Sequence, residues 1–322
     1  MFDLSEDLNR RYGNHRAGWV YALDCMRELH SDHGTKVISF VEKKFVFGSE
    51  VGEARNGFQQ IHEPWIGFVH CPLVIPIWFN HDYSPEQFFR QDNFQQAMRH
   101  CVGLYSLSTP LAVWLRERFP GPVDVVLHPT ELVARTFSTK NWCRRRARKV
   151  IQLGFWLRRL NAIWNLPLPG NYTKVIVGVN QPWQKNMLYL EREILGEAHD
   201  DGDVTWHGLL SNEAYDELLT SAIVFIDFYD TSANNAIVEC IARGIPVVCP
   251  PSQAVVDYLG AEYPLYFRSY LHAAELCMDD VMIERAHMYM MESGIREAIS
   301  PRRFIENLRM SAVFRNTSSR EV

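Results

Sequence analysis

The sequence predicts an α/β protein of two domains, each built on a parallel sheet. Apolar runs of strand length alternate with segments of helical periodicity, which is the order that gives parallel sheets covered by helices. The chain has 322 residues, enough for two cores of ordinary size. From about Thr139 to Arg148 the composition turns polar and basic, and the alternation then restarts. We expect one domain over residues 1–140 and a second over residues 141–322, with the final helix able to pack back on the first.

Predicted strands and helices alternate along both halves of the chain. Residues 14–34 carry apolar side chains at helical spacing and end in a glycine, and residues 110–119 open with a proline, as helices do. The first half therefore has these two helices and strands over residues 35–41, 64–70, 101–108 and 122–131. The second half has a strand from Lys149, strands over 172–180, 222–228 and 244–250, helices over 212–221 and 252–260, and a last amphipathic helix opened by Pro301. Residues 181–203 give a mainly polar stretch.

Composition and charge exclude several classes of function. The net charge of -5 does not indicate a protein that binds polyanions over a broad basic surface. The run "CRRRARK" at residues 143–149 is basic enough to contact phosphates, although such runs are more often a solvated face. Seven cysteines without a CxxC pair indicate reduced thiols in a cytoplasm rather than disulfides or zinc. No stretch approaches the ~18 apolar residues of a membrane span, and the first residues do not resemble a signal peptide. We expect a cytoplasmic protein with no membrane span and no metal.

The stretch "TSANNA" at residues 231–236 stands directly before an apolar helix. Its small residues allow a ligand to approach the backbone, and the free N–H groups of a helix start suit a diphosphate. A plain helix cap by Ser232 or Asn234 is the alternative. The sequence contains neither GxGxxG nor GxxxxGK[ST], so a dinucleotide oxidoreductase or a phosphate-loop ATPase is not indicated.

Glu239 is a carboxylate within that apolar helix. A buried carboxylate is costly unless it is paired or placed for a ligand. Glu239 follows the helix start by one to two turns, so its side chain can accept hydrogen bonds from two hydroxyls, such as a ribose diol. The alternative is an ion pair with Arg243, four residues later on the same face.

The segments "VTWHGLLSNEAYDELLTSAIVFIDF" and "SANNAIVECIARGIPVV" together resemble the C-terminal half of retaining, nucleotide-sugar-dependent glycosyltransferases of the GT-B fold, glycosyltransferase group 1 or family 4-like. The resemblance is best over residues 204–248. Glu239 matches the family's glutamate, which binds the donor ribose. The matching residues of the closing motif are Glu239, Gly244, Pro246, Val247 and Val248. The resemblance implies two Rossmann-like domains with parallel sheets that face a central cleft, an acceptor-binding N-terminal domain and a nucleotide-sugar-binding C-terminal domain.

The chain departs from the family at several donor-site positions. The second glutamate of the family, eight positions before Glu239, is Thr231 here, and Asp230 is the adjacent carboxylate. Arg159 stands where a lysine is usual, next to Arg158, and the resemblance implies that these two arginines bind the diphosphate. The glycines of the family's loop are also replaced. The loop expected to bind the donor consists of Thr231, Ser232, Ala233, Asn234 and Asn235.

Four residues of the N-terminal half complete the predicted site. Gly13 and Gly18 of "YGNHRAGW" stand where the family has a glycine-containing loop beneath the donor phosphates, although a simple helix-start turn explains them equally well. His70 ends a strand, where the family often has a histidine near the sugar; a structural histidine is the alternative. Glu42 is expected to end another strand and to activate the acceptor, unless it forms a surface ion pair with Lys43 or Lys44.

The sequence therefore predicts a hexosyl- or pentosyltransferase that moves a sugar from a nucleotide diphosphate sugar, such as a UDP-sugar, to an acceptor hydroxyl. Arginines and a helix dipole stabilise the leaving group, so neither a metal nor another cofactor is expected. His70, Glu42 and Asp230 are the catalytic candidates. Two alternatives remain open: a bacteriophage-type enzyme that glycosylates hydroxymethylated DNA bases, and a GT-B-like sugar-nucleotide epimerase or binding protein without transferase activity.

Overall fold

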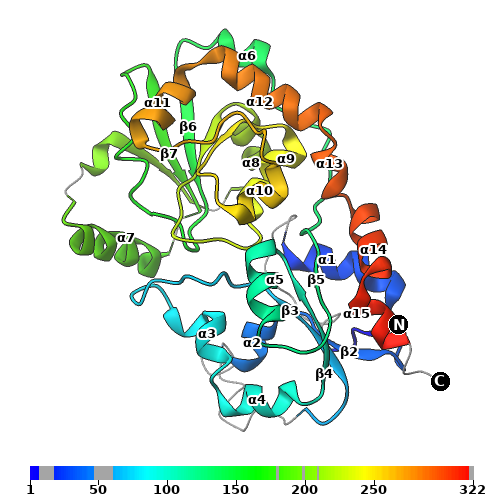
Figure 1. Ribbon diagram of the computed structural model, residues 1–322. Coiled ribbons are helices and arrows are strands. Elements are labelled where there is room, and N and C mark those ends of the chain that lie inside the picture. The colour runs from blue at the N-terminus through cyan, green and yellow to red at the C-terminus, as the bar shows by residue number, and fades with distance from the viewer. Residues whose placement is uncertain (7–17, 47–60, 179–180, 198–199, 209, 319–322) are drawn as a thin grey trace. The chain divides into compact units, whose positions relative to one another are not determined.

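The computed structural model describes residues 1–322 except 7–17, 47–60, 179–180, 198–199, 209 and 319–322 (Figure 1). The chain divides into two compact units. Unit 1 consists of Met1–Glu131, Asp230–Asn235 and Glu297–Val322, and unit 2 consists of Leu132–Tyr229 and Ala236–Arg296. Each unit contains a parallel sheet covered by helices, so the predicted α/β class is confirmed.

The sheet of unit 1 has the order β1-β2-β3-β4-β5, and all neighbouring strands are parallel. Its central strand β3 reads WIGFV and is buried at every position, as expected for a parallel strand covered on both faces. Figure 1 shows α2 and α5 on one side of these strands and α1, α14 and α15 on the other. The strands are β1 (Phe2–Asp3), β2 (Thr35–Ile38), β3 (Trp65–Val69), β4 (Cys101–Ser106) and β5 (Val123–Val125). The helices are α1 (Trp19–Met26), α2 (Val41–Phe45), α3 (Pro85–Phe88), α4 (Asp92–Met98), α5 (Thr109–Arg116), α14 (Pro301–Met310) and α15 (Ala312–Ser318).

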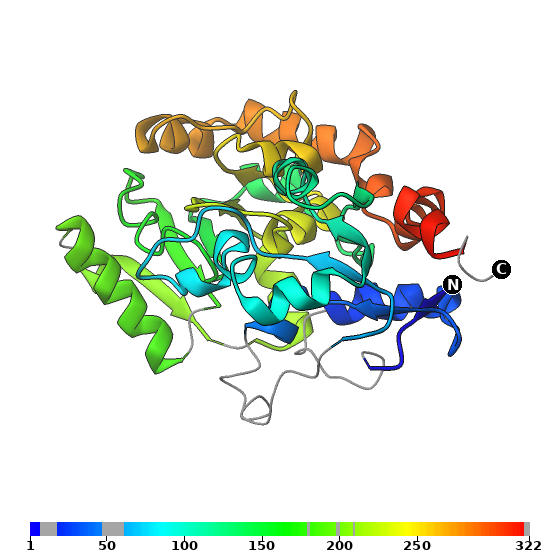
Figure 2. The ribbon, with the colours of Figure 1, turned by 60° about the horizontal axis from the view of Figure 1, so that its bottom comes forward.

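The last two helices of the chain belong to unit 1. Both α14 and α15 lie beside α1 and β1 (Figures 1 and 2), where Phe2, Phe304 and Val313 share one buried core. The carboxylate of Asp124 accepts the backbone N–H of Val313 at 2.8 Å, which fixes the start of α15 on the end of the sheet. The two ends of the chain therefore complete a single core.

The sheet of unit 2 has the order β10-β9-β6-β7-β8, again with parallel neighbours. The chain first builds outward from β6 through β7 to β8 and then returns to the other side of β6 with β9. Open parallel sheets bind ligands outside the carboxyl ends of the strands at such a reversal. The strands are β6 (Arg148–Leu153), β7 (Tyr172–Val177), β8 (Val204–His207), β9 (Ile223–Phe225) and β10 (Val247–Val248). The remaining helices are α6 (Thr139–Cys143), α7 (Pro182–Leu195), α8 (Asn212–Thr220), α9 (Asn235–Arg243), α10 (Gln253–Leu259), α11 (Tyr270–Met278), α12 (Asp280–Glu292) and α13 (Ile295–Ala298).

Two element predictions are wrong. The strand predicted over residues 35–41 stops at Ile38, and the chain turns into α2, where Val41 and Phe45 are buried one helical turn apart. The polar stretch after β7 contains the 14-residue helix α7, which starts with Pro182 and a capping box in which Gln181 and Gln184 exchange side-chain bonds with the backbone. The composition obscured α7 because most of its surface faces solvent.

Candidate functional site

The polar site of unit 2 lies where β6 and β9 end. Gly154 follows β6 with φ of +86°, a conformation that glycine adopts without strain, and turns the chain back across the sheet edge. The segment after it is bonded to the segment after β9 through backbone groups. Arg159 N–H donates to the Asp227 carbonyl at 3.0 Å, and Tyr229 N–H donates to the Leu157 carbonyl at 3.0 Å. Two loops at the reversal of strand order therefore form one connected surface.

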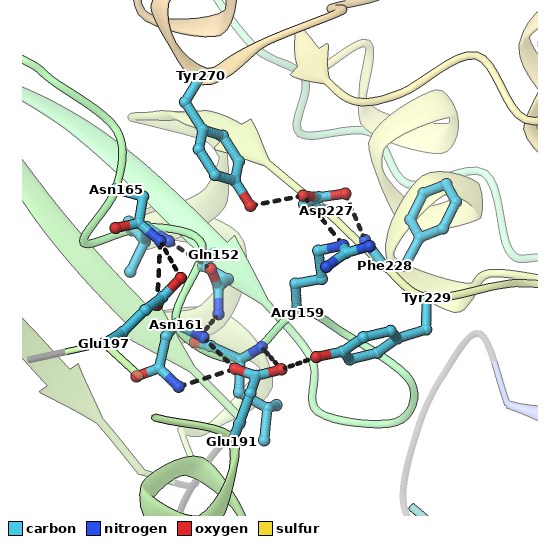
Figure 3. Close-up of polar contacts among 12 residues, drawn as sticks. Gln152, Arg159, Asn161, Asn165, Glu191, Glu197, Asp227, Phe228, Tyr229 and Tyr270 are labelled. Atoms are coloured by element: carbon cyan, nitrogen blue, oxygen red, sulfur yellow. Dashed lines mark hydrogen bonds and ion pairs between the residues drawn. The ribbon is translucent and has the colours of Figure 1, made fainter. Parts of the chain in front are cut away.

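Glu191 of α7 fixes this surface from below (Figure 3). Its side chain is 0% exposed, yet both oxygens are satisfied. Oε1 accepts from Leu160 N–H at 3.1 Å and from the Tyr229 hydroxyl at 2.7 Å, and Oε2 accepts from the backbone and side-chain nitrogens of Asn161, both at 2.8 Å. A buried carboxylate with four donors is a structural clamp. It holds both loops in place.

Asp227 and Arg159 form a polar pair on that surface (Figure 3). Asp227 Oδ2 accepts the Tyr270 hydroxyl at 2.8 Å and lies 3.6 Å from Arg159 Nε. Burial raises the pKa of Asp227, and the Tyr270 hydrogen bond and the Arg159 charge partly oppose this. The Arg159 side chain is 41% exposed and its guanidinium lies 4.7 Å from the centre of the Tyr229 ring. At the reversal of strand order, Arg159 is thus an accessible cation, and the Asp227 carboxylate orients its guanidinium.

Arg158, the neighbour of Arg159, points inward. Its Nε donates to the Leu153 carbonyl and its Nη1 to the Trp156 carbonyl, both at 3.1 Å. The residue is 7% exposed, and burial lowers the pKa of the guanidinium to about 10. The two arginines predicted to bind phosphate therefore differ in burial and in their hydrogen-bond partners. Arg158 holds the turn after β6, and Arg159 presents its charge to solvent.

Glu239 occupies the middle of α9, whose residues from Ala236 to Arg243 are all buried. The Glu239 side chain is 3% exposed, and its Oε2 accepts a hydrogen bond from the hydroxyl of Tyr215 on α8. Arg243 forms its ion pair with Asp216, at 2.8 Å, and donates to the backbone carbonyl of Glu239 at 3.2 Å. The alternative of a Glu239–Arg243 ion pair is therefore wrong. The carboxylate is oriented by a tyrosine instead.

The loop before α9 is part of unit 1. Asp230 Oδ2 accepts the N–H of Val74 at 2.9 Å, and Oδ1 accepts the N–H of Thr231 at 2.8 Å. Burial raises the pKa of Asp230. The hydroxyls of Ser232 and Ser108 are hydrogen-bonded, 3.3 Å apart. Asp230 thus anchors the loop through backbone groups. Of the other predicted loop residues, Thr231, Ser232 and Asn234 are buried, Ala233 packs against the core and Asn235 is exposed.

His70 directly follows β3, so its predicted place at a strand end is confirmed. Its Nε2 lies 2.9 Å from the carbonyl of Ser39, and since a carbonyl only accepts, the ring proton is on Nε2. The imidazole is flanked by Trp19, with ring centres 4.3 Å apart, and by Phe40, at 4.1 Å. Burial lowers the pKa of His70 to about 3. The ring is therefore neutral at physiological pH.

Glu42 does not have the setting predicted from the sequence. It lies in α2 rather than at a strand end, and it is 0% exposed rather than part of a surface ion pair. Lys44 pairs with Glu6 instead, at 3.1 Å. Glu42 Oε1 accepts the N–H of His70 at 2.8 Å and that of Cys71 at 2.6 Å. Burial raises the pKa of Glu42 to about 7, although these hydrogen bonds lower it.

The structure gives no specific reason for glycine at Gly18, and it does not describe Gly13. Gly18 caps the start of α1 with φ of -84°, which any residue can adopt. Gly13 lies outside the described residues.

Within the part of the chain that the structure describes, no three His, Cys, Asp or Glu side chains are grouped so as to hold a metal ion. Among the same residues, no helix is both long and apolar enough to cross a bilayer. A hollow of about 580 Å³ in unit 1 is bordered by Arg99, Cys101 and Arg118. It lies at the starting end of β4, the opposite end from His70, so it is not part of the site described above.

Several site residues were not predicted from the sequence. Asp227 and Tyr270 form a hydrogen-bonded pair at the carboxyl ends of the strands of unit 2. Tyr215 donates a hydrogen bond to Glu239. Asp227 had a signal, because it comes two residues after the apolar strand β9. No sequence pattern indicated the two tyrosines, because Tyr215 is 24 residues from Glu239 along the chain and Tyr270 is 43 residues from Asp227.

No family model and no curated protein matches this sequence. Solved structures do match. The sucrose-phosphate synthase of Thermosynechococcus elongatus has a TM-score of 0.63 and 12% identity, over 93% of this chain and 77% of that one. HepE of Anabaena in complex with UDP and glucose has a TM-score of 0.56 and 12% identity, over 76% and 70%. TarM of S. aureus, crystallised with Fondaparinux, alpha-GlcNAc-glycerol and UDP, has a TM-score of 0.56 and 11% identity, over 90% and 57%. The chain has the GT-B fold of these proteins.

Proposed function

We propose that this protein is a glycosyltransferase that transfers a sugar from a nucleotide diphosphate sugar, most simply a UDP-sugar, to an acceptor hydroxyl. The observation that carries the proposal is the connected polar surface at the reversal of strand order in unit 2, where Arg159 is exposed and directed by Asp227. HepE and TarM, which share the fold, were crystallised with UDP. This likeness supports a nucleotide ligand.

In the proposed reaction, unit 2 binds the nucleotide and stabilises the leaving group. Glu239 accepts hydrogen bonds from the ribose hydroxyls, and the hydroxyl of Tyr215 orients its carboxylate. Arg159 neutralises charge on the diphosphate, which grows as the bond to the sugar breaks. Residues 231–235 are proposed as donor-binding because they precede α9, whose first N–H groups suit an anion. In this proposal Arg158 holds the turn that precedes Arg159. Gly13 and Gly18 are proposed to contribute to donor binding beneath the phosphates.

In unit 1, His70 is the side chain proposed to meet the reacting sugar or the acceptor. Its imidazole is neutral and carries its proton on Nε2, so Nδ1 is the atom that can accept a hydrogen bond from a hydroxyl. Asp230 is the carboxylate of the loop before α9 that we propose as a second catalytic candidate, and its two oxygens accept backbone N–H groups.

The test is a thermal-shift screen of nucleoside diphosphates and nucleotide sugars, followed by assays for transfer to mixed glycan and small-molecule acceptors. A ligand at 100 times its dissociation constant stabilises the protein by about 2.7 kcal/mol, a readily measured shift. We expect a uridine diphosphate or a related nucleotide to raise the melting temperature, and its sugar ester to be turned over. No shift with any nucleotide would refute the proposal.

Neutralising Arg159 should weaken diphosphate binding selectively. A hydrogen bond to a charged group contributes about 1.5–3 kcal/mol, so Arg159→Met should bind UDP roughly 10- to 150-fold more weakly. Uridine, which has no phosphate, should bind as it does to the wild type. Arg145→Met, in the exposed basic run, is the matched control and should leave both affinities unchanged. Equal losses for UDP and uridine would assign Arg159 a structural role instead.

Turnover should not need a divalent ion. Arg159 and the start of α9 supply the positive charge that a metal supplies in other transferases. Activity should therefore persist in excess EDTA. Loss of activity with EDTA and recovery on adding manganese would contradict this proposal.

A further inference from the structure

The buried carboxyl of Glu42 holds the turn in which His70 lies. Glu42 Oε1 accepts the backbone N–H groups of both His70 and Cys71, two consecutive residues that leave the end of β3. These N–H groups lie past the last ladder pair of β3, so the sheet does not satisfy them. Without the carboxyl they would be buried donors without partners, which is unfavourable. The turn therefore depends on a side chain from a different segment.

The same segment also fixes the ring of His70. Ser39, Phe40 and Glu42 all follow β2: the Ser39 carbonyl accepts from Nε2, and Phe40 packs on the imidazole. Trp19 also contacts the ring. Residues 39–42 thus determine both the backbone position of His70 and the direction of its ring.

We propose that Glu42 is a positioning residue: its carboxyl fixes the backbone of His70 and Cys71 and so determines where the His70 imidazole meets the substrate. This inference rests on the proposed function and replaces the prediction that Glu42 itself activates the acceptor. A group that takes a proton from an acceptor must come within hydrogen-bond distance of it. Glu42 has 0% exposure, one oxygen is occupied by two N–H groups, and the other is buried without a hydrogen-bond partner among the described residues.

Two substitutions separate positioning from acid–base chemistry. Glu42→Gln retains an oxygen that can accept both N–H groups but cannot exchange a proton, so it should keep kcat and KM within about 3-fold of the wild type. Glu42→Leu removes the acceptor. Since a misplacement of about 1 Å can cost 10²-fold in rate, kcat should fall by roughly 30-fold or more while KM changes little.

The matched control is Asp124 on β5, two strands away from β3, another carboxylate of unit 1 that accepts a backbone N–H, that of Val313. Asp124→Leu should lower stability without the loss in kcat. Because Glu42 acts through His70, adding Glu42→Leu to His70→Gln should cost less than about 2-fold beyond His70→Gln alone. Independent multiplication of the two losses would overturn the inference, as would a Glu42→Gln variant as inactive as His70→Gln.

A readout that needs no activity keeps the inference separate from the proposed function. In protein labelled with 15N-histidine, the His70 resonances, assigned with His70→Gln, should report a proton on Nε2. They should be unchanged in Glu42→Gln and Asp124→Leu and displaced in Glu42→Leu. If Glu42→Leu does not fold, Glu42→Gln still decides, because a displaced His70 spectrum in that variant contradicts the clamp. Absence of any nucleotide-dependent turnover in the wild type would refute the proposed function while leaving this spectral test valid.

Discussion

UDP should bind to Glu239→Gln roughly 10- to 150-fold more weakly than to the wild type, because hydrogen bonds from the ribose hydroxyls to a charged carboxylate contribute about 1.5–3 kcal/mol. The substitution keeps the size of the side chain and leaves an oxygen for the Tyr215 hydroxyl. Arg243 does not rely on this carboxylate, since its ion pair is with Asp216. The melting temperature should therefore change little. Titration calorimetry with UDP measures the loss directly.

Two controls make the result specific to the ribose. A 2′-deoxy ligand already lacks one of the hydroxyls, so it should lose less affinity on the mutation than UDP does. Tyr215→Phe removes the donor to Glu239 but keeps the carboxylate, so it should weaken UDP binding less than Glu239→Gln. If Glu239→Gln unfolded the protein while the remaining folded fraction bound both ligands normally, Glu239 would have a structural role and not a ligand-binding one.

Glu42→Gln should gain stability over the wild type as the pH rises. Burial raises the pKa of Glu42 from 4.5 to about 7, so the folded state holds this proton more tightly than the unfolded state does. The stabilisation from the bound proton is complete below pH 4.5 and is lost as the pH rises towards 7. At about 1.36 kcal/mol per pKa unit, the wild type should lose roughly 3 kcal/mol over this window through Glu42. Glutamine has no proton to lose.

Unfolding of both proteins in urea at pH 4, 6 and 8 tests this expectation. The difference in stability between Glu42→Gln and the wild type should grow by about 3 kcal/mol from pH 4 to pH 8, because the other titrating groups contribute equally to both. In the folded state the neighbouring His70, with its pKa lowered to about 3, and Cys71, with its pKa raised above the ordinary thiol value, do not titrate in the window. Parallel profiles for the two proteins would mean that Glu42 ionises normally in the folded state.

Local sequence patterns predicted the strands and the motif helix well. Buried parallel strands such as β3 are continuous apolar runs, and α9 is followed by Gly244, whose φ of +61° favours the residue type that the motif supplies. The fold class followed from the order of these elements. The positions of His70 and Glu239 followed as well, since each depends only on the bounds of one element.

The partners of the site residues could not be predicted in the same way. Glu42 was assigned to a strand because "VISFV" reads as one apolar run, whereas tertiary packing of Val41 and Phe45 turns its end into α2. Whether an arginine faces inward, as Arg158 does, or outward, as Arg159 does, depends on a turn set by Gly154 and by the clamp of Glu191. Such choices depend on contacts between segments far apart in the chain.

The central claim is that a nucleotide binds at the reversal of strand order in unit 2. Hydrogen exchange of the wild-type protein with and without saturating UDP tests it most directly. The account predicts slower exchange of backbone amides in residues 154–160 and 227–229 and in α9, with the largest change near Arg159. Unchanged exchange in these segments, or protection confined to the hollow beside Arg99 and Arg118, would contradict it.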